Sequence, residues 1–230
     1  MTRKDLILAC LLLLLMMPVC VPLWAVEEPS RPDVDADLTN AEETKIEALK
    51  SLDVNGAIGE ITKDAFMIDE NSLDTEIYFG FAGRSREAVD RALNLLKNPR
   101  LQIVGNNRID RTEEFFVARK ILQVFPEESM PEISAIYEAS DTSIKNNLIE
   151  ALGNMAGGQA RSILISALDD KTPLEQEEFE EGGGEPLRIC DAAYNQLVLR
   201  YQVADVLRTI GSAHTLEQRD YHISVLRQKI

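Results

Sequence analysis

The sequence predicts an all-α protein in which consecutive helix pairs stack into an α-solenoid. The first observation is residues 144–173, IKNNLIEALGNMAGGQARSILISALDDKTP, where apolar residues recur every three or four positions on both sides of Gly157-Gly158. The second is a fainter copy of this pattern about 28 residues upstream, and the third is a partial copy 45 residues downstream. A pair this short cannot bury its apolar stripe alone, so neighbouring pairs must share one core.

The central pair shows the pattern most clearly. The two glycines are predicted to form a tight turn that requires a positive backbone φ. The second helix is predicted to stop at Asp169-Asp170, shortly before Pro173. The predicted inward positions are Ile144, Leu148, Leu152 and Met155 in the first helix and Ile163, Leu164, Ala167 and Leu168 in the second.

The two copies align with the central pair at apolar positions. The upstream copy pairs Phe116 with Ile144, Ile121 with Ile149, Val124 with Leu152, Ile136 with Leu164 and Ala139 with Ala167. The downstream copy pairs Ile144 with Ile189, Leu148 with Ala193 and Leu152 with Leu197. The additional length before the downstream copy is taken up by an inserted loop, LEQEEFEEGGGEP.

Further helices are predicted on both sides of these copies. Thr39 is an expected N-cap for a helix with Ile46, Leu49 and Leu52 on its apolar face, and Ser85 opens a helix that stops at Asn98-Pro99. Residues 53–83 contain several glycines and support no firm prediction. The other expected helices are 112–125, which Pro126 ends, a segment beginning at Met130, and a closing helix at 215–228 with Leu216, Val225 and Leu226 inward.

The central pair resembles a HEAT-like repeat of the short type found in bacterial proteins and in the phycobilisome-lyase repeat family. The matching residues are Ala151, Leu152, Gly153, Met155 and Ala160. The segment LRICDAAYNQLV resembles the first helix of another such repeat, through Arg188, Ala192, Ala193 and Leu197. The resemblance covers roughly residues 84–210, and it implies a HEAT/armadillo-like superhelix. The 112–141 copy departs from the pattern because it lacks the Leu-Gly turn, and the inserted loop breaks the repeat period.

The N-terminus has the composition of a secretory signal peptide. Arg3 and Lys4 precede the uncharged run LILACLLLLLMMPVCVPLWA, after which the sequence becomes acidic. We therefore expect residues 1–25 to be a signal peptide, 26–38 a disordered lead-in, and 39–230 the helical domain of an exported, periplasmic or secreted protein. An uncleaved membrane anchor formed by residues 6–23 remains open, as does a lipid attached at Cys20.

Charge and cysteine content restrict the partners and the chemistry. The net charge of −15 disfavours binding to nucleic acid or to anionic lipid, so membrane contact is expected only through an uncleaved leader. With Cys10 and Cys20 in the leader, Cys190 is the only cysteine of the mature chain, which excludes an intramolecular disulfide.

No combination of residues in the sequence indicates catalysis. His214 and His222 are interpreted as surface or capping residues rather than metal ligands, because a third ligand at suitable spacing is not evident. Cys190 lies within an apolar stripe and is interpreted as a small core residue rather than a nucleophile. Gly-rich phosphate loops and serine elbows are absent from the sequence. We therefore expect no catalytic, metal or cofactor-binding residues.

The inserted loop is the most distinctive polar feature. Its carboxylates are candidates for contact with a basic protein or peptide, although a solvated loop or a weak calcium site is also compatible with the composition. The expected function is non-enzymatic protein binding or scaffolding in the cell envelope. The alternatives are an enzyme related to the phycobilisome lyases, which attach bilins to cysteine, and a membrane-tethered structural module. The candidate contact residues are Glu175, Glu177, Glu178, Glu180 and Glu181.

Overall fold

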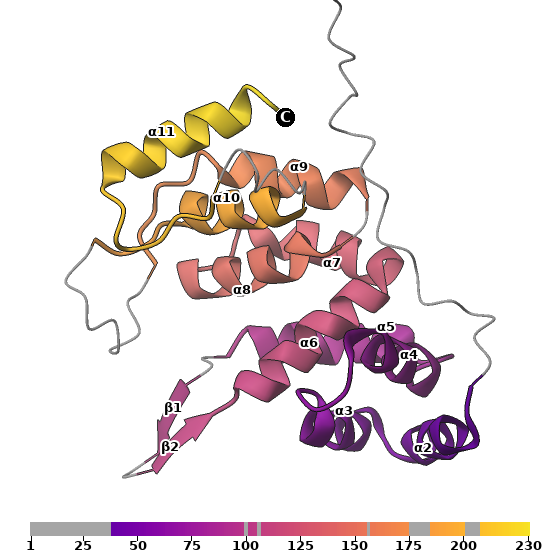
Figure 1. Ribbon diagram of the computed structural model, residues 1–230. Helices are drawn as coiled ribbons and strands as arrows, with labels where there is room; N and C mark the ends of the chain where they lie inside the picture. The colour runs from indigo at the N-terminus through magenta and orange to yellow at the C-terminus, as the bar shows by residue number, and fades with distance from the viewer. Residues whose placement is uncertain (1–37, 99–100, 105–106, 156, 175–184, 201–207) are drawn as a thin grey trace, which may run out of the picture.

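The described residues of the computed structural model are predominantly helical, which confirms the predicted helical class. The structure describes residues 38–98, 101–104, 107–155, 157–174, 185–200 and 208–230. This part contains ten helices and one two-stranded hairpin (Figure 1). The elements are α2 (Asn40–Ser51), α3 (Val54–Asp64), α4 (Glu70–Gly80), α5 (Ser85–Leu96), β1 (Leu101–Val104), β2 (Asn107–Asp110), α6 (Thr112–Val124), α7 (Pro126–Tyr137), α8 (Thr142–Gly153), α9 (Gly158–Ala167), α10 (Ile189–Arg200) and α11 (Leu216–Arg227).

The first helices begin at side chains that cap their free backbone N–H groups. Thr39 and Glu42 form a reciprocal capping box at α2, as the sequence suggested for Thr39. Residues 53–83, which supported no prediction, form α3 and α4, and Asp53 and Asp69 accept hydrogen bonds from the first turns of these helices. Leu52 was expected on the apolar face of α2 but is 38% exposed, because the helix ends at the preceding residue.

The middle of the chain forms two series of packed helices. In one series α6 packs against α8, and α8 packs against α10; in the other α5 packs against α7, and α7 against α9. The sequential neighbours α6–α7 and α8–α9 also pack against each other. Figure 1 shows this progression from α2–α5 at one end of the described chain to α11 at the other. The upstream, central and downstream copies of the sequence pattern are therefore spatial neighbours.

One continuous apolar core runs through these helices, from Leu49 in α2 to Leu226 in α11. In the central pair Leu148, Leu152 and Met155 are fully buried. Ile144 and Ile163, which were also predicted to face inward, are only partly buried and pack against the edge of the core. The remaining predicted inward residues of the second helix, Leu164, Ala167 and Leu168, are buried.

The turn between α8 and α9 depends on Gly157. This residue has φ = +99° and forms the N-terminal cap of α9. Gly158 is the first residue of α9 and does not have a positive φ. The sequence prediction of a positive φ is thus confirmed for Gly157 and wrong for Gly158. Gln159 then donates a 2.9 Å hydrogen bond to the Ser134 hydroxyl and links α9 to α7.

Alanine substitution at Gly157 and at Gly158 should change the free energy of unfolding by different amounts. We expect Gly157→Ala to lower the free energy of unfolding by about 1–2 kcal/mol, because a side chain disfavours positive φ. Gly158→Ala should be neutral or stabilising by up to about 1 kcal/mol, since a Cβ there meets no heavy atom within 4 Å and alanine favours the helix. Urea denaturation of both variants measures the difference. Equal destabilisation by the two substitutions would contradict the assignment of the turn to Gly157.

Three expectations about the elements are corrected by the structure. Pro126 was expected only to end a helix, but it is also the first residue of α7. Proline is tolerated at this position because the first N–H groups of a helix make no intrahelical hydrogen bond. The helix expected from Met130 therefore begins four residues earlier. Ala139 lies beyond the end of α7 and is exposed. Leu216 was expected to face inward but is 39% exposed, whereas Leu226 is buried as predicted, together with Arg219 and Ile223.

The antiparallel hairpin β1–β2 was not predicted. Leu101 pairs with Asp110 and Val104 with Asn107, and Figure 1 shows the hairpin projecting away from the helices between α5 and α6. Strands this short leave only a weak alternating pattern in the sequence, which explains why it was missed. The hairpin separates the two helices without interrupting their packing against each other.

The predicted signal peptide at 1–25, including the alternative anchor at 6–23, lies outside the described residues, as does the lead-in at 26–38 except for Leu38. Within the part of the chain that is described, none of the helices combines the length and the hydropathy needed to cross a bilayer.

Candidate functional site

The inserted loop leaves the helical array from a closed base. Its glutamates Glu175, Glu177, Glu178, Glu180 and Glu181 lie outside the described residues, but both ends of the loop are described. Pro173 and Arg188 form an antiparallel bridge. The Leu174 N–H donates a 2.7 Å hydrogen bond to the Leu187 carbonyl, and the Ile189 N–H donates a 3.0 Å hydrogen bond to the Thr172 carbonyl. The two ends of the loop are therefore held together before the acidic segment begins.

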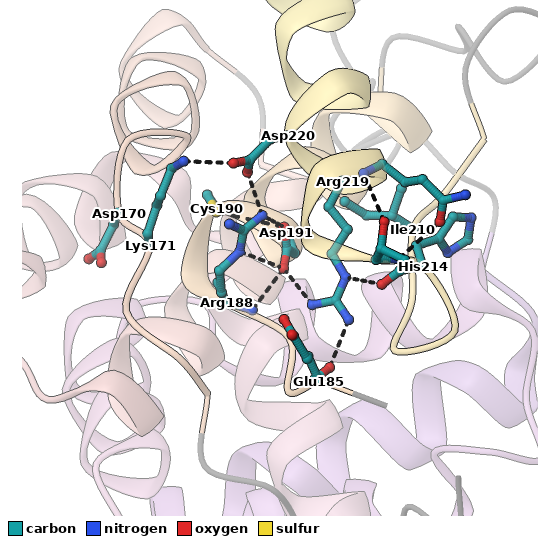
Figure 2. Close-up of polar contacts among 12 residues, drawn as sticks. Asp170, Lys171, Glu185, Arg188, Cys190, Asp191, Ile210, His214, Arg219 and Asp220 are labelled. Atoms are coloured by element: carbon teal, nitrogen blue, oxygen red, sulfur yellow. Dashed lines mark hydrogen bonds and ion pairs between the residues drawn. The ribbon is translucent and has the colours of Figure 1, made fainter. Parts of the chain in front are cut away.

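Arg219 connects the base of the loop to α11 through hydrogen bonds. Its side chain, from α11, is fully buried, and its guanidinium donates to the backbone carbonyl of Glu185 at 2.7 Å (Figure 2). It also donates to the backbone carbonyl of Pro186 at 2.8 Å. The same guanidinium donates to the carbonyl of His214 at 3.0 Å and to the Asp191 carboxylate at 3.2 Å. One side chain thus joins the loop base, the first turn of α10 and the start of α11.

Asp191 supplies the negative charge at the centre of this cluster. Its carboxylate is fully buried and accepts from the Arg188 backbone N–H at 3.0 Å and from the Arg188 guanidinium at 2.8 and 3.1 Å. The side-chain hydrogen bonds to Asp191 are the main reason that the pKa of Arg188 is raised. Two buried guanidinium groups share one carboxylate, which makes Asp191 the residue that compensates the buried charge.

The cluster continues to the protein surface through Asp220. The Asp220 carboxylate lies 2.8 Å from the Arg188 guanidinium and accepts a 2.8 Å hydrogen bond from Lys171 (Figure 2). The hydrogen bond from Lys171, followed by the one from Arg188, lowers the pKa of Asp220. We call Lys171, Arg188, Asp191, Arg219 and Asp220 the base cluster. Its geometry is that of a structural clamp on the inserted loop.

Cys190 is a core residue, as its position in an apolar stripe suggested. The thiol is buried, and burial followed by the adjacent charge of Asp191 raises its pKa to about 12. The thiol is therefore protonated at neutral pH, whereas a nucleophilic cysteine needs a lowered pKa and exposure.

The two histidines lie close together beside the base cluster. The ring centroids of His214 and His222 are 6.1 Å apart with nearly perpendicular planes, and His214 Nδ1 accepts a 3.1 Å hydrogen bond from the Gly211 N–H. Thr215 starts α11 between them, as predicted. In the portion of the chain that is described, groups of three or more His, Cys, Asp or Glu residues arranged to hold a metal ion are not found.

A second candidate site is a cavity of about 260 Å³ where the α4–α5 turn meets the α6–α7 junction. The rings of Tyr78 and Phe125 lie nearly parallel there, with centroids 6.1 Å apart. The Ser85 hydroxyl donates a 2.7 Å hydrogen bond to Glu128, and Glu127 is the other charged residue of the wall. We call this the α4–α7 pocket. Its remaining lining residues are Ala82, Gly83, Val124 and Pro126.

Sequence reasoning identified neither the base cluster nor the α4–α7 pocket. One available signal was the position of Arg219, which lies four residues before Ile223 and seven before Leu226, on the apolar face of α11. An arginine on that face indicates a buried charge that requires partners. The pocket residues come from α4, the α4–α5 turn, the start of α5 and the α6–α7 junction, and no local pattern in the sequence brings them together.

No known family model, curated protein or solved structure matches the chain. The structure itself shows a mainly helical protein in which the two ends of the inserted loop are held by the buried charges of the base cluster.

Proposed function

We propose that this chain is an exported, non-enzymatic binding protein, built as a short HEAT-like α-solenoid, and that its inserted loop contacts a basic protein or peptide. The observation that carries the proposal is the closed base of the loop. The bridge between Pro173 and Arg188, together with the carbonyl contacts of Arg219, fixes both ends of the acidic insertion.

The arrangement of the helices supports the solenoid part of the proposal. Helices α6, α8 and α10 pack in sequence in one series, and α5, α7 and α9 in the other, as in a stack of helix pairs. Such a stack presents an extended surface on which loops project from one edge. The hydrogen bonds that join the two ends of the loop support its assignment as a contact surface.

The charge of the chain supports a basic partner. The net charge is −15, and the inserted loop concentrates five of the acidic residues within seven positions. Clustered carboxylates increase the association rate of a cationic partner and make binding sensitive to salt. Fixing the two ends of the loop reduces the conformational entropy that binding would otherwise cost.

Charge neutralisation of the loop tests the proposal. The probe is an acetylated and amidated hexalysine peptide, titrated by calorimetry into the wild-type chain without its first 25 residues and into a variant with Gln at positions 175, 177, 178, 180 and 181. We expect the variant to bind on the order of tenfold more weakly at low salt. The matched control replaces five exposed glutamates elsewhere, at 43, 87, 113, 138 and 217. The proposal is rejected when both variants lose affinity equally or when the wild type does not bind.

A further inference from the structure

We propose that an exposed apolar patch at the α3–α4 turn binds the apolar face of a basic amphipathic helix in the partner. The patch consists of Phe66 and Met67, together with the partly buried ring of Phe116 in α6. We call it the turn patch. The inference rests on the proposed function, because it takes the partner to be basic, and it adds a contact that is separate from the inserted loop.

The side chains of the turn patch are not needed to fill the core. Met67 is 87% exposed and Phe66 is 58% exposed, whereas the next residue, Ile68, packs against the core. The ring of Phe66 lies beside that of Phe116, with centroids 5.0 Å apart, so the two rings form one apolar surface. Large apolar side chains that adjoin each other at the surface indicate an interaction site, whereas a single exposed one does not.

The backbone beneath the turn patch is fixed on both sides. The Met67 N–H donates a 2.7 Å hydrogen bond to the Asp64 carbonyl at the end of α3. The Asp69 carboxylate accepts a 3.1 Å hydrogen bond from the Ser72 N–H and caps α4. Both α3 and α4 pack against α6, as Figure 1 shows. The apolar side chains are therefore held in place before binding, which lowers the entropy that binding costs.

Carboxylates outnumber cations beside the turn patch. Two lysines near the turn each contact two carboxylates, and a third lysine contacts one. The groups are Lys45 with Asp64 and Glu76, Lys120 with Glu70 and Asp74, and Lys63 with Glu60. The Asp64 and Glu70 side chains lie just before and just after the turn and are 53% and 66% exposed. An approaching partner therefore meets an apolar surface with negative charge on both sides of it.

This charge selects among the possible occupants of the turn patch. A second copy would bring the same carboxylates against one another, and an anionic lipid surface would be repelled. A basic amphipathic helix instead offers apolar side chains to Phe66 and Met67 and cations to Asp64 and Glu70. The flexible, polarisable side chain of methionine adapts to such apolar surfaces. Binding through the apolar face of a helix is a recurring mode of peptide recognition.

NMR of the methionine methyl groups tests the inference with controls inside the chain. Without its first 25 residues the chain contains Met67, Met130 and Met155, of which the last two are buried. The probe is an acetylated and amidated helical peptide with leucines on one face and lysines on the other. We expect a saturable shift of the Met67 methyl signal, while the Met130 and Met155 signals stay unchanged. A scrambled peptide of the same composition, which has no apolar face, should bind on the order of tenfold more weakly.

A substitution in the turn patch measures the apolar contribution. We expect Phe66→Ser to weaken binding of the amphipathic peptide on the order of tenfold, as read from the Met67 signal, because it removes an aromatic anchor. The matched control is Leu199→Ser, which replaces a leucine in α10 that is 59% exposed and should leave the affinity unchanged. Thermal unfolding and unchanged Met130 and Met155 signals confirm that both variants are folded.

A second substitution measures the contribution of charge. Asp64→Asn should weaken binding about two- to fivefold at low salt, and added salt should remove this difference. Asp169→Asn also neutralises an exposed aspartate that is paired with a basic side chain, but it lies far along the chain from the turn patch and should have no effect. Equal weakening by the two aspartate variants would contradict a local role of Asp64.

A Met67 signal that does not respond to the peptide, or that responds equally in Phe66→Ser and Leu199→Ser, would overturn the inference. So would a Met67 shift caused by chain concentration alone, which indicates a second copy, or one caused only by phosphatidylcholine vesicles, which indicates a lipid surface. A chain that binds hexalysine through the inserted loop without a Met67 response to the peptide would reject the turn patch and leave the proposed function standing. A Met67 response without hexalysine binding would reject the loop contact and support the turn patch.

Discussion

Replacing Asp191 with asparagine is expected to lower the free energy of unfolding by about 3–5 kcal/mol, since it removes the charge that two buried arginines share. Asp191 and Arg219 have fully buried side chains, and the Arg188 side chain is 7% exposed. Asparagine preserves the size of the side chain but removes the carboxylate that contacts the Arg219 guanidinium at 3.2 Å. Solvent cannot compensate a charge at this depth.

The matched control is Asp169→Asn. Asp169 also contacts α11, through a 2.6 Å ion pair with Arg227, but its side chain is 78% exposed. Loss of this pair should cost about 0–1 kcal/mol, because solvent and salt screen it. Urea denaturation of the three proteins under identical conditions measures both values. If Asp191→Asn and Asp169→Asn were equally mild, the base cluster would not be the buried clamp described above.

Leu152→Ala is expected to destabilise the chain by about 2–5 kcal/mol, because it leaves a cavity in the middle of the packed series. Leu152 is fully buried in α8, which packs against α6, α9 and α10. The loss combines the transfer free energy of the missing methyl groups with the contacts that the neighbouring helices no longer make. The substitution should also destabilise the helices that pack against α8.

Leu199→Ala provides the comparison within the same packed series. Leu199 lies in α10 and is 59% exposed, so its truncation removes little buried surface and should change the free energy of unfolding by less than about 0.5 kcal/mol. Urea midpoints and slopes for both variants give the two free energies. A Leu152→Ala variant as stable as Leu199→Ala would show that α8 is not enclosed by its neighbours.

The helical class and most of the core follow from periodicity. Leu148, Leu152, Ile121 and Leu197 were assigned to inward positions from their spacing, and all four are fully buried. Apolar spacing predicts burial wrongly at the ends of helices, where the neighbouring elements decide how exposed a side chain is. Leu216 and Leu52 are examples. Residues 53–83 were unreadable because Gly56 and Gly59 lie inside α3 and tertiary packing outweighs their low helix propensity.

The candidate sites were less predictable because they depend on contacts between distant residues. Asp191 and Arg219 are 28 positions apart, and Tyr78 lies in α4 whereas Phe125 lies between α6 and α7. Arg188 had been singled out only through its match to the repeat pattern, and its pairing with Asp191 could not be derived from that match. The glutamates of the inserted loop were selected from composition alone, and they remain a prediction about residues that the structure does not describe.

The central claim is that the helix pairs are interdependent parts of one core. Native-state hydrogen exchange of the wild type and Leu152→Ala, followed by mass spectrometry, tests it most directly, because exchange reports the opening of each helix separately. We predict that the substitution lowers protection in α8 and also in α6 and α10, which pack against it. Loss of protection confined to α8 and α9, with α6 and α10 unchanged, would contradict the claim.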